Sequence, residues 1–149
     1  MNSKRTLPPT YVLISIVAMV VLHFLFPLMK IVPLPWNVIG IIPLALGIAI
    51  NIVADNALHQ ADTTVKPFEE STALVTNGAY RISRHPMYLG FVLILIGVAI
   101  LLGSLSPCVV IPIYAILMDQ IFIKVEERML EARFGQAWLA YKRQTRRWI

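Results

Sequence analysis

Charge is scarce in this sequence: only 14% of its 149 residues are Asp, Glu, Lys or Arg, whereas 58% are hydrophobic. So few charges exclude an ordinary soluble domain and indicate an integral membrane protein. The single cysteine, Cys108, excludes an internal disulfide and is expected to be a packed membrane residue. No Gly-rich G-x-G-x-x-G segment follows a strand, which excludes a Rossmann-type nucleotide site. Internal repeats and low-complexity tracts are also missing.

The charge that is present is mostly positive, with a net charge of +5. No DNA-binding or RNA-binding signature accompanies it. We therefore expect the positive charge to attract anionic membrane lipid, and we expect no nucleic-acid partner.

Four apolar segments approach the roughly 17 to 25 residues that span a bilayer. They cover residues 11–29, 36–53, 87–102 and 107–123. We predict an all-α integral membrane protein with four transmembrane helices in two hairpins and a C-terminal interfacial amphipathic helix.

The predicted chain forms one membrane domain over residues 1–149. An N-terminal helical hairpin occupies residues 1–57, and a core of loop, hairpin and C-terminal helix occupies residues 58–149. Twelve of the thirteen basic residues fall on one side of this topology, and only Lys30 falls on the other. Because basic residues near spans stay cytoplasmic, we expect both termini in the cytoplasm, and a bacterial or archaeal inner membrane.

A signal peptide is the alternative for the N-terminus, because Lys4 and Arg5 precede an apolar run. However, the run continues to Phe26 without a clear small-residue cleavage site, and Pro8 and Pro9 are typical of a helix start. A membrane span is the favoured interpretation.

The polar segment 58–84 is too long for an ordinary connection, so it is either functional or disordered. Residues 74–76 look extended, and Asn77-Gly78 is typical of a tight turn, which favours order. In the following hairpin Gly90 and Gly97 lie seven residues apart on one helix face, where another helix could approach closely.

Two polar clusters flank that hairpin. The run 78–88 sets cations and aromatic rings at the mouth of an uncharged helix, and Glu126-Glu127 follow the next apolar segment. A hairpin would return both clusters to one membrane face, where they could share a pocket. The alternative is that Arg84 and the glutamate pair form surface ion pairs with lipid head groups. Tyr80 and Tyr88 would then belong to an aromatic belt at the membrane interface.

Beyond the glutamates, an apolar stripe recurs at near-helical spacing and predicts the amphipathic helix. Its members are Leu130, Phe134, Trp138 and Tyr141. Gly135 is expected to break this helix in two. The end 146–149, with two arginines, suits a lipid head-group anchor, and a solvated tail is the alternative.

These motifs carry a resemblance. The run LVTNGAYRISRHPMYLG, then Gly97, a helix ending in Glu-Glu and FGQAWLAYKR resemble the isoprenylcysteine carboxyl methyltransferase and phospholipid methyltransferase family over residues 62–145. The resemblance implies an integral membrane enzyme that uses S-adenosylmethionine, with no metal. It implies a cofactor site formed by Leu74, Val75, Tyr80, Arg84, His85, Pro86, Met87, Tyr88 and Glu127, next to Glu126.

The chemistry of these residues agrees with that cofactor. A carboxylate can accept from an ammonium or from ribose hydroxyls, Arg84 or His85 can donate to a carboxylate, and tyrosine faces suit an adenine or a sulfonium. An amine acceptor would first need to lose a proton, and Glu126, His85 or Asp119 could take it. A carboxylate or thiolate acceptor would need no base, and the sequence leaves this open.

Prenylcysteine-methylating members of the family carry an arginine about one turn before the glutamate pair, whereas this chain has DQIFI at 119–123. We therefore expect a small lipophilic or amphiphilic substrate, with a carboxylate, thiol or amine as the acceptor, that enters from the bilayer. Two rival functions remain: a non-enzymatic membrane subunit of the same fold, and an NADPH-dependent reductase of a lipophilic substrate.

Polar residues inside the spans complete the candidates. Asp119 and Gln120 are expected to share helix faces with Glu126 and Glu127 respectively, seven residues on. For these residues, and for Asn51 and Asp55 in the second span, a contact between helices and a substrate role are both open.

Overall fold

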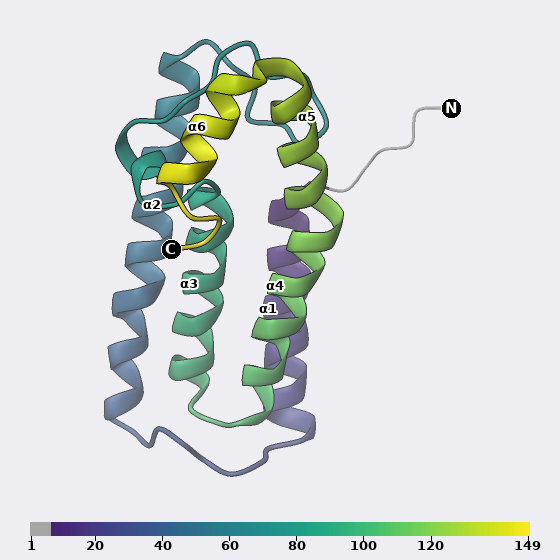
Figure 1. The fold of residues 1–149 in the computed structure, drawn as a ribbon. Helices are drawn as coiled ribbons and strands as arrows, with labels where there is room; N and C mark the ends of the chain where they lie inside the picture. The colour runs from purple at the N-terminus through teal and green to yellow at the C-terminus, as the bar shows by residue number, and fades with distance from the viewer. Residues whose placement is uncertain (1–6) are drawn as a thin grey trace.

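The computed structural model describes residues 7–149. Helices α1 to α4 run alternately up and down, while α5, α6 and the long loop gather at one end (Figure 1). The six α-helices of the described residues are α1 (Pro8–Leu25), α2 (Ile41–Gln60), α3 (Pro86–Leu102), α4 (Val110–Met118), α5 (Lys124–Phe134) and α6 (Gln136–Gln144). Lys4 and Arg5, used above for orientation, lie outside the described residues.

Short helical turns extend these elements. Three are 3₁₀ turns: η1 (Trp36–Gly40), η2 (Gly78–Arg81) and η3 (Ser106–Val109). The fourth, η4 (Asp119–Ile123), is a π turn that joins α4 to α5 in one continuous helix. Within residues 7–149 the only β-type pairing is an isolated bridge between Lys30 and Ser104, so the predicted all-helical class is confirmed for this part of the chain.

Three continuous helices of the described residues are long and apolar enough to cross a membrane: Pro8–Leu25, Trp36–Gln60 and Ser106–Phe134. The remaining predicted span, α3, is a shorter apolar helix of 17 residues. The first helix ends at Leu25 rather than at Met29, because the residue before Pro27 is disfavoured in helical geometry.

Helix α3 lies at the centre of the bundle and packs against α1, α2 and α4. Glycines allow its close approach to α2. A Cβ on Gly47 would lie 2.4 Å from the Gly90 oxygen, and a Cβ on Gly97 would lie 2.7 Å from the Gly40 oxygen. The predicted role of Gly90 and Gly97 is confirmed, and the facing helix carries its own glycines with the same seven-residue spacing.

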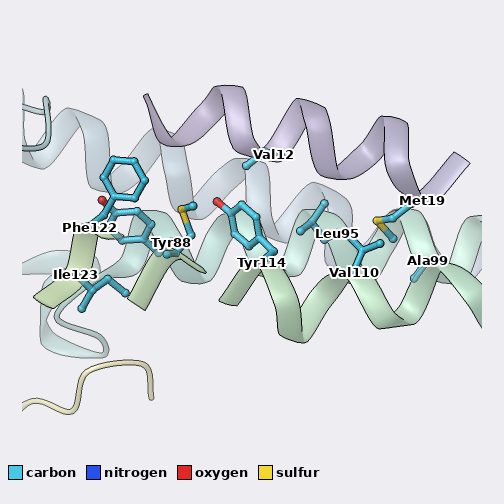
Figure 2. Packing of buried hydrophobic residues seen from close by; sticks show 10 residues of the cluster. Val12, Met19, Tyr88, Leu95, Ala99, Val110, Tyr114, Phe122 and Ile123 are labelled. Carbon is cyan, nitrogen blue, oxygen red and sulfur yellow. The ribbon is translucent and has the colours of Figure 1, made fainter. Parts of the chain in front are cut away.

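On its other side α3 contributes to the hydrophobic core. Figure 2 shows side chains of α1, α3 and the α4–η4 helix meeting along the bundle. Leu95 and Met118 are fully buried, and at one end the core continues into Tyr88 and Phe122. Because Tyr88 also belongs to the candidate site described below, packing of the bundle positions the site directly.

The opposite end of the bundle is closed by hydrogen bonds. The amides of Ile31 and Val32 donate to the Gly103 oxygen, at 2.8 and 3.1 Å. His23 Nδ1 lies 2.7 Å from Ser104 Oγ, which gives this intramembrane histidine a structural contact between the hairpins. These contacts join the two hairpins far from the candidate site.

The glycine contact yields a test on α2. Gly47→Leu forces a side chain against the backbone of α3, and overpacking of this kind costs about 1–3 kcal/mol. We expect a lower free energy of unfolding in detergent, measured by thermal or denaturant unfolding. Ala49→Leu is the control, because Ala49 is exposed on the same helix. Equal stability of the two variants would contradict the close α2–α3 contact.

Candidate functional site

A cavity of about 570 Å³ opens at the end of the bundle that holds the long loop. Its walls come from the start of α1, loop residues 64–75, the segment around the start of α3, and one face of α5 and α6. The volume falls within the roughly 300–1,000 Å³ typical of small-molecule sites. It is therefore the candidate site.

The long loop is folded over this cavity. Thr63 Oγ1 accepts a hydrogen bond of 3.0 Å from the Thr72 amide, and Thr72 Oγ1 donates to the Asp62 oxygen at 2.7 Å. Phe68 packs on Phe122 of η4, with the ring centroids 5.4 Å apart. These contacts settle the alternative of disorder in favour of an ordered loop.

A buried corner begins α3. Pro86 occupies the first turn of the helix, where its missing N–H costs nothing. The amide of His85 donates to Ser83 Oγ at 3.1 Å, and this hydroxyl donates to the Arg147 oxygen at 3.0 Å. The His85 ring, 4% exposed, is thereby turned toward α5.

The two glutamates meet this corner from the first turn of α5. His85 Nδ1 lies 3.4 Å from Glu126 Oε2, and His85 Nε2 lies 3.4 Å from Glu127 Oε1. Tyr88 donates to Glu126 Oε1 at 2.7 Å, and Arg84 Nη2 lies 3.0 Å from Glu127 Oε1. The predicted meeting of the two polar clusters is confirmed.

The glutamates differ in what they face. Glu126 lines the cavity together with most of the residues named from the resemblance; these are Leu74, Val75, Tyr80, Arg84, His85, Pro86, Met87 and Tyr88. Glu127 does not line it. Its carboxylate is buried beside the cavity among Arg84, His85 and Arg147.

An aromatic wall from α6 completes the site, and sequence reasoning did not assign it there. Trp138 and Tyr141 are buried and line the cavity. Tyr141 donates to the Tyr80 oxygen at 2.6 Å, and the Arg84 guanidinium lies 5.7 Å from the centre of a Trp138 ring. The three-residue spacing of Trp138 and Tyr141 indicated one helix face, but not which partner that face would meet. The predicted break at Gly135 is confirmed by its positive φ of +50°.

Arg147 is the residue that the sequence interpretation placed wrongly. Instead of anchoring to lipid head groups, its guanidinium donates to both Glu127 oxygens, from Nε at 3.1 Å and from Nη2 at 2.5 Å. Its Nη1 donates to Asp119 Oδ1 at 3.1 Å. Trp148 packs against the hydrophobic core, so the alternative of a solvated tail is wrong for these two residues as well.

The π turn explains why the expected pairing of α4 with α5 is off by one residue. Two α-helical turns take about 7.2 residues, and a π turn inserts about one more. Asp119 therefore shares a face with Glu127, eight residues on, and both bind Arg147. Gln120 is exposed and bonds to Lys124 instead.

The polar residues of α2 remain outside this cluster. Asn51 donates to the Gly47 oxygen within its own helix at 2.9 Å. Asp55 pairs with His59 at 3.4 Å. Neither lines the cavity.

The surroundings of His85 favour its protonated form. Burial acts to lower the pKa of His85, but hydrogen bonds to Glu126 and Glu127 and the charges of both carboxylates outweigh it. The pKa of His85 is therefore raised above its usual 6.5. A protonated imidazole between two carboxylates is a hydrogen-bond donor rather than a base.

Comparison with known proteins identifies the family. A family model described as phospholipid methyltransferase matches residues 36–137, more than half of the chain. The chain belongs to this family. The resemblance found in the sequence is thus confirmed, and the candidate cavity is formed largely within the matched region.

Two individual proteins are similar to parts of this chain. Protein-S-isoprenylcysteine O-methyltransferase A of Arabidopsis thaliana is 35% identical over 77 residues, which cover 50% of this chain and 38% of the relative. An uncharacterized protein of Haemophilus influenzae is 35% identical over 63 residues, which cover 42% of this chain and all of that protein.

A solved structure gives the same result. The eukaryotic intramembrane Ras methyltransferase, an isoprenylcysteine carboxyl methyltransferase, matches with a TM-score of 0.70 and 26% identity over 100% of this chain and 53% of its own. The chain thus spans about half the length of the solved relative, and the match extends to 38% of the Arabidopsis one.

The raised pKa of His85 predicts a pH dependence of stability. The folded state binds the proton more tightly than the unfolded chain, so this stabilisation is present below pH 6.5 and is lost as pH rises through the folded pKa. We expect the thermal midpoint of the native protein to fall across this range relative to that of His85→Gln, which has no imidazole to titrate. Parallel pH profiles would contradict the assignment.

Proposed function

We propose that this chain is a membrane methyltransferase that uses S-adenosylmethionine to methylate a small lipophilic or amphiphilic acceptor at the cytoplasmic membrane face. The observation that carries the proposal is the meeting of the His85 corner with Glu126 in the wall of an otherwise largely apolar cavity. The family, and the methyltransferase relatives with their shared fold, support it.

The residues present fit the cofactor chemically. Glu126 offers a carboxylate for an ammonium. The Arg84 guanidinium, whose Nε has no hydrogen-bond partner among the described residues, offers a donor for a carboxylate. The aromatic faces of Tyr80 and Trp138 lie on the same cavity and suit a purine or a sulfonium. When bound, S-adenosylmethionine supplies an electrophilic methyl group on its sulfonium.

Within this proposal the two glutamates have different roles. Glu127 is already paired with Arg84, Arg147 and His85, so we assign it a positioning role. Glu126 lines the cavity and accepts a hydrogen bond from Tyr88, which leaves it able to contact a ligand. This revises the sequence-based roles, in which Glu127 was the cofactor contact.

The same arrangement suggests how proton transfer would be handled. An amine acceptor must lose a proton, and Glu126 is the better base because His85, held between two carboxylates, favours its protonated form. A carboxylate or thiolate acceptor would need no base. Methyl transfer then depends mainly on alignment and on exclusion of water by the loop and the start of α1.

The apolar half of the cavity suits the acceptor. Phe68, Phe91, Met129 and Leu130 line it beside the polar corner. A lipophilic molecule entering from the bilayer would bury its apolar part there and present its acceptor atom to the polar half. A membrane lipid or a smaller amphiphile satisfies this description.

We place the protein in a bacterial or archaeal inner membrane with four spans, in which α3 crosses the membrane in addition to the three longer helices. Its apolar side chains and its central packing against three helices support this placement. The loop, α5 and α6 would face the cytoplasm with both termini, because most basic residues lie at that end. Residues 58–149 then form the cofactor-binding core behind the hairpin 1–57.

Calorimetry of the detergent-purified protein tests the proposal. We expect binding of S-adenosylhomocysteine and S-adenosylmethionine but not of NADPH. Glu126→Gln should weaken S-adenosylhomocysteine binding about tenfold or more, since hydrogen bonds to charged groups are worth about 1.5–3 kcal/mol. Glu131→Gln is the matched control, because Glu131 lies on the same helix but is exposed.

Other outcomes would decide for the rival functions. Binding of NADPH alone would indicate the reductase, and no binding of any nucleotide would indicate the non-enzymatic subunit. Transfer of a labelled methyl group into a membrane lipid extract, compared between the native protein and Glu126→Gln, would then identify the acceptor class. Equal labelling by both would remove Glu126 from the site.

A further inference from the structure

Arg147 lies farther along the chain than any motif that pointed to the site, yet it binds Glu127, the carboxylate buried beside the cavity. Its guanidinium bonds to Glu127 through two nitrogens and to Asp119 through the third. The Glu127 side chain is 7% exposed and that of Asp119 is 19% exposed. One cation thus joins the π turn to the first turn of α5.

The backbone around Arg147 is bound as well. The Arg84 amide donates to the Arg146 oxygen at 3.0 Å, and Ser83 Oγ donates to the Arg147 oxygen at 3.0 Å. Figure 1 shows the last residues turning back from α6 toward the start of α3. The last residues therefore pack along residues 83–84, which lead into His85.

From this geometry we propose that Arg147 is a positioning residue, the centre of a clamp with Glu127 and Asp119 that fixes the corner carrying Arg84 and His85. Glu127 is the shared element, because its Oε1 contacts Arg84, His85 and Arg147. Without Arg147, Glu127 Oε2 would lose its cation, and the carboxylate would be held only through Oε1 by Arg84 and His85. The partner of both cavity-lining cations would then be less firmly fixed.

The planar fork of arginine is needed for this role. A guanidinium can bond to two oxygens of one carboxylate and still direct a third donor to another carboxylate, whereas an ammonium acts as a point charge. The π turn is the matching feature, since it brings Asp119 onto the face of Glu127. The clamp rests on the proposed function only for its effect on the cofactor.

Arg146 provides a matched control. It carries the same charge and directly precedes Arg147 in the chain, but its side chain is exposed. If these arginines served only to attract anionic lipid, Arg146→Ala and Arg147→Ala would have similar effects. The clamp predicts that Arg147→Ala weakens binding of S-adenosylhomocysteine about tenfold or more, while Arg146→Ala leaves it unchanged, both measured by calorimetry in one detergent.

A rescue experiment separates positioning from general stability. Free guanidinium ion, well below denaturing concentration, should restore much of the affinity lost in Arg147→Ala, whereas methylammonium should not. If Arg147→Ala does not fold, Arg147→Lys keeps the charge without the fork and should fold with weakened binding. Thermal midpoints of all variants report folding independently.

The outcomes distinguish the two proposals. If the native protein binds S-adenosylhomocysteine but Arg147→Ala and Arg146→Ala bind it equally well, or Arg147→Lys matches the native affinity, the clamp is overturned and the proposed function stands. If the native protein binds no S-adenosyl ligand, the proposed function fails, and the positioning role fails with it.

Discussion

The buried carboxylate of Glu127 is the charge around which the functional end of this protein is organised. A carboxylate withdrawn from water is costly unless cations and hydrogen bonds replace its hydration. Here Arg84 and His85 approach it from the start of α3, and Arg147 approaches it from beyond α6. No short segment of chain could supply all three partners, so satisfying Glu127 requires the hairpin to close and the last residues to return. Removing any one cation would leave part of a buried charge uncompensated.

This pairing has a consequence for the cavity. Because Glu127 is occupied by its own cations, the neighbouring Glu126 is left to line the cavity beside Tyr88, and two adjacent residues of the same type acquire different environments. The hydrophobic bundle underneath makes this stable, since α3 is held on one side by the glycine contact with α2 and on the other by the core with α1 and α4. The polar corner of the site is therefore built on the packed apolar bundle.

Local patterns predicted a large part of this arrangement. The apolar segments gave the helices to within a few residues, with three exceptions. Pro27 ended the first helix early, the second helix continued beyond residue 53 to Gln60, and the last span continued through the π turn. The spacing of Gly90 and Gly97 indicated a close helix contact, and one hairpin between two polar clusters was enough to expect that they meet. These features depend on short-range periodicity or on a single turn, which is why sequence reasoning could reach them.

The sequence by itself determined the membrane-type helical bundle, through hydropathy, and the family, through its motifs. It also determined the meeting of the His85 corner with the glutamate pair, because only one hairpin separates these two clusters. The tertiary structure alone decided which glutamate faces the cavity, that Trp138 and Tyr141 pack inward, and that Arg147 binds Glu127 rather than lipid. Each of these depends on where a distant segment comes to rest. An apolar or basic side chain can be buried or paired either against lipid or against protein. Which of the two it meets depends on the position of the distant segment in the folded chain.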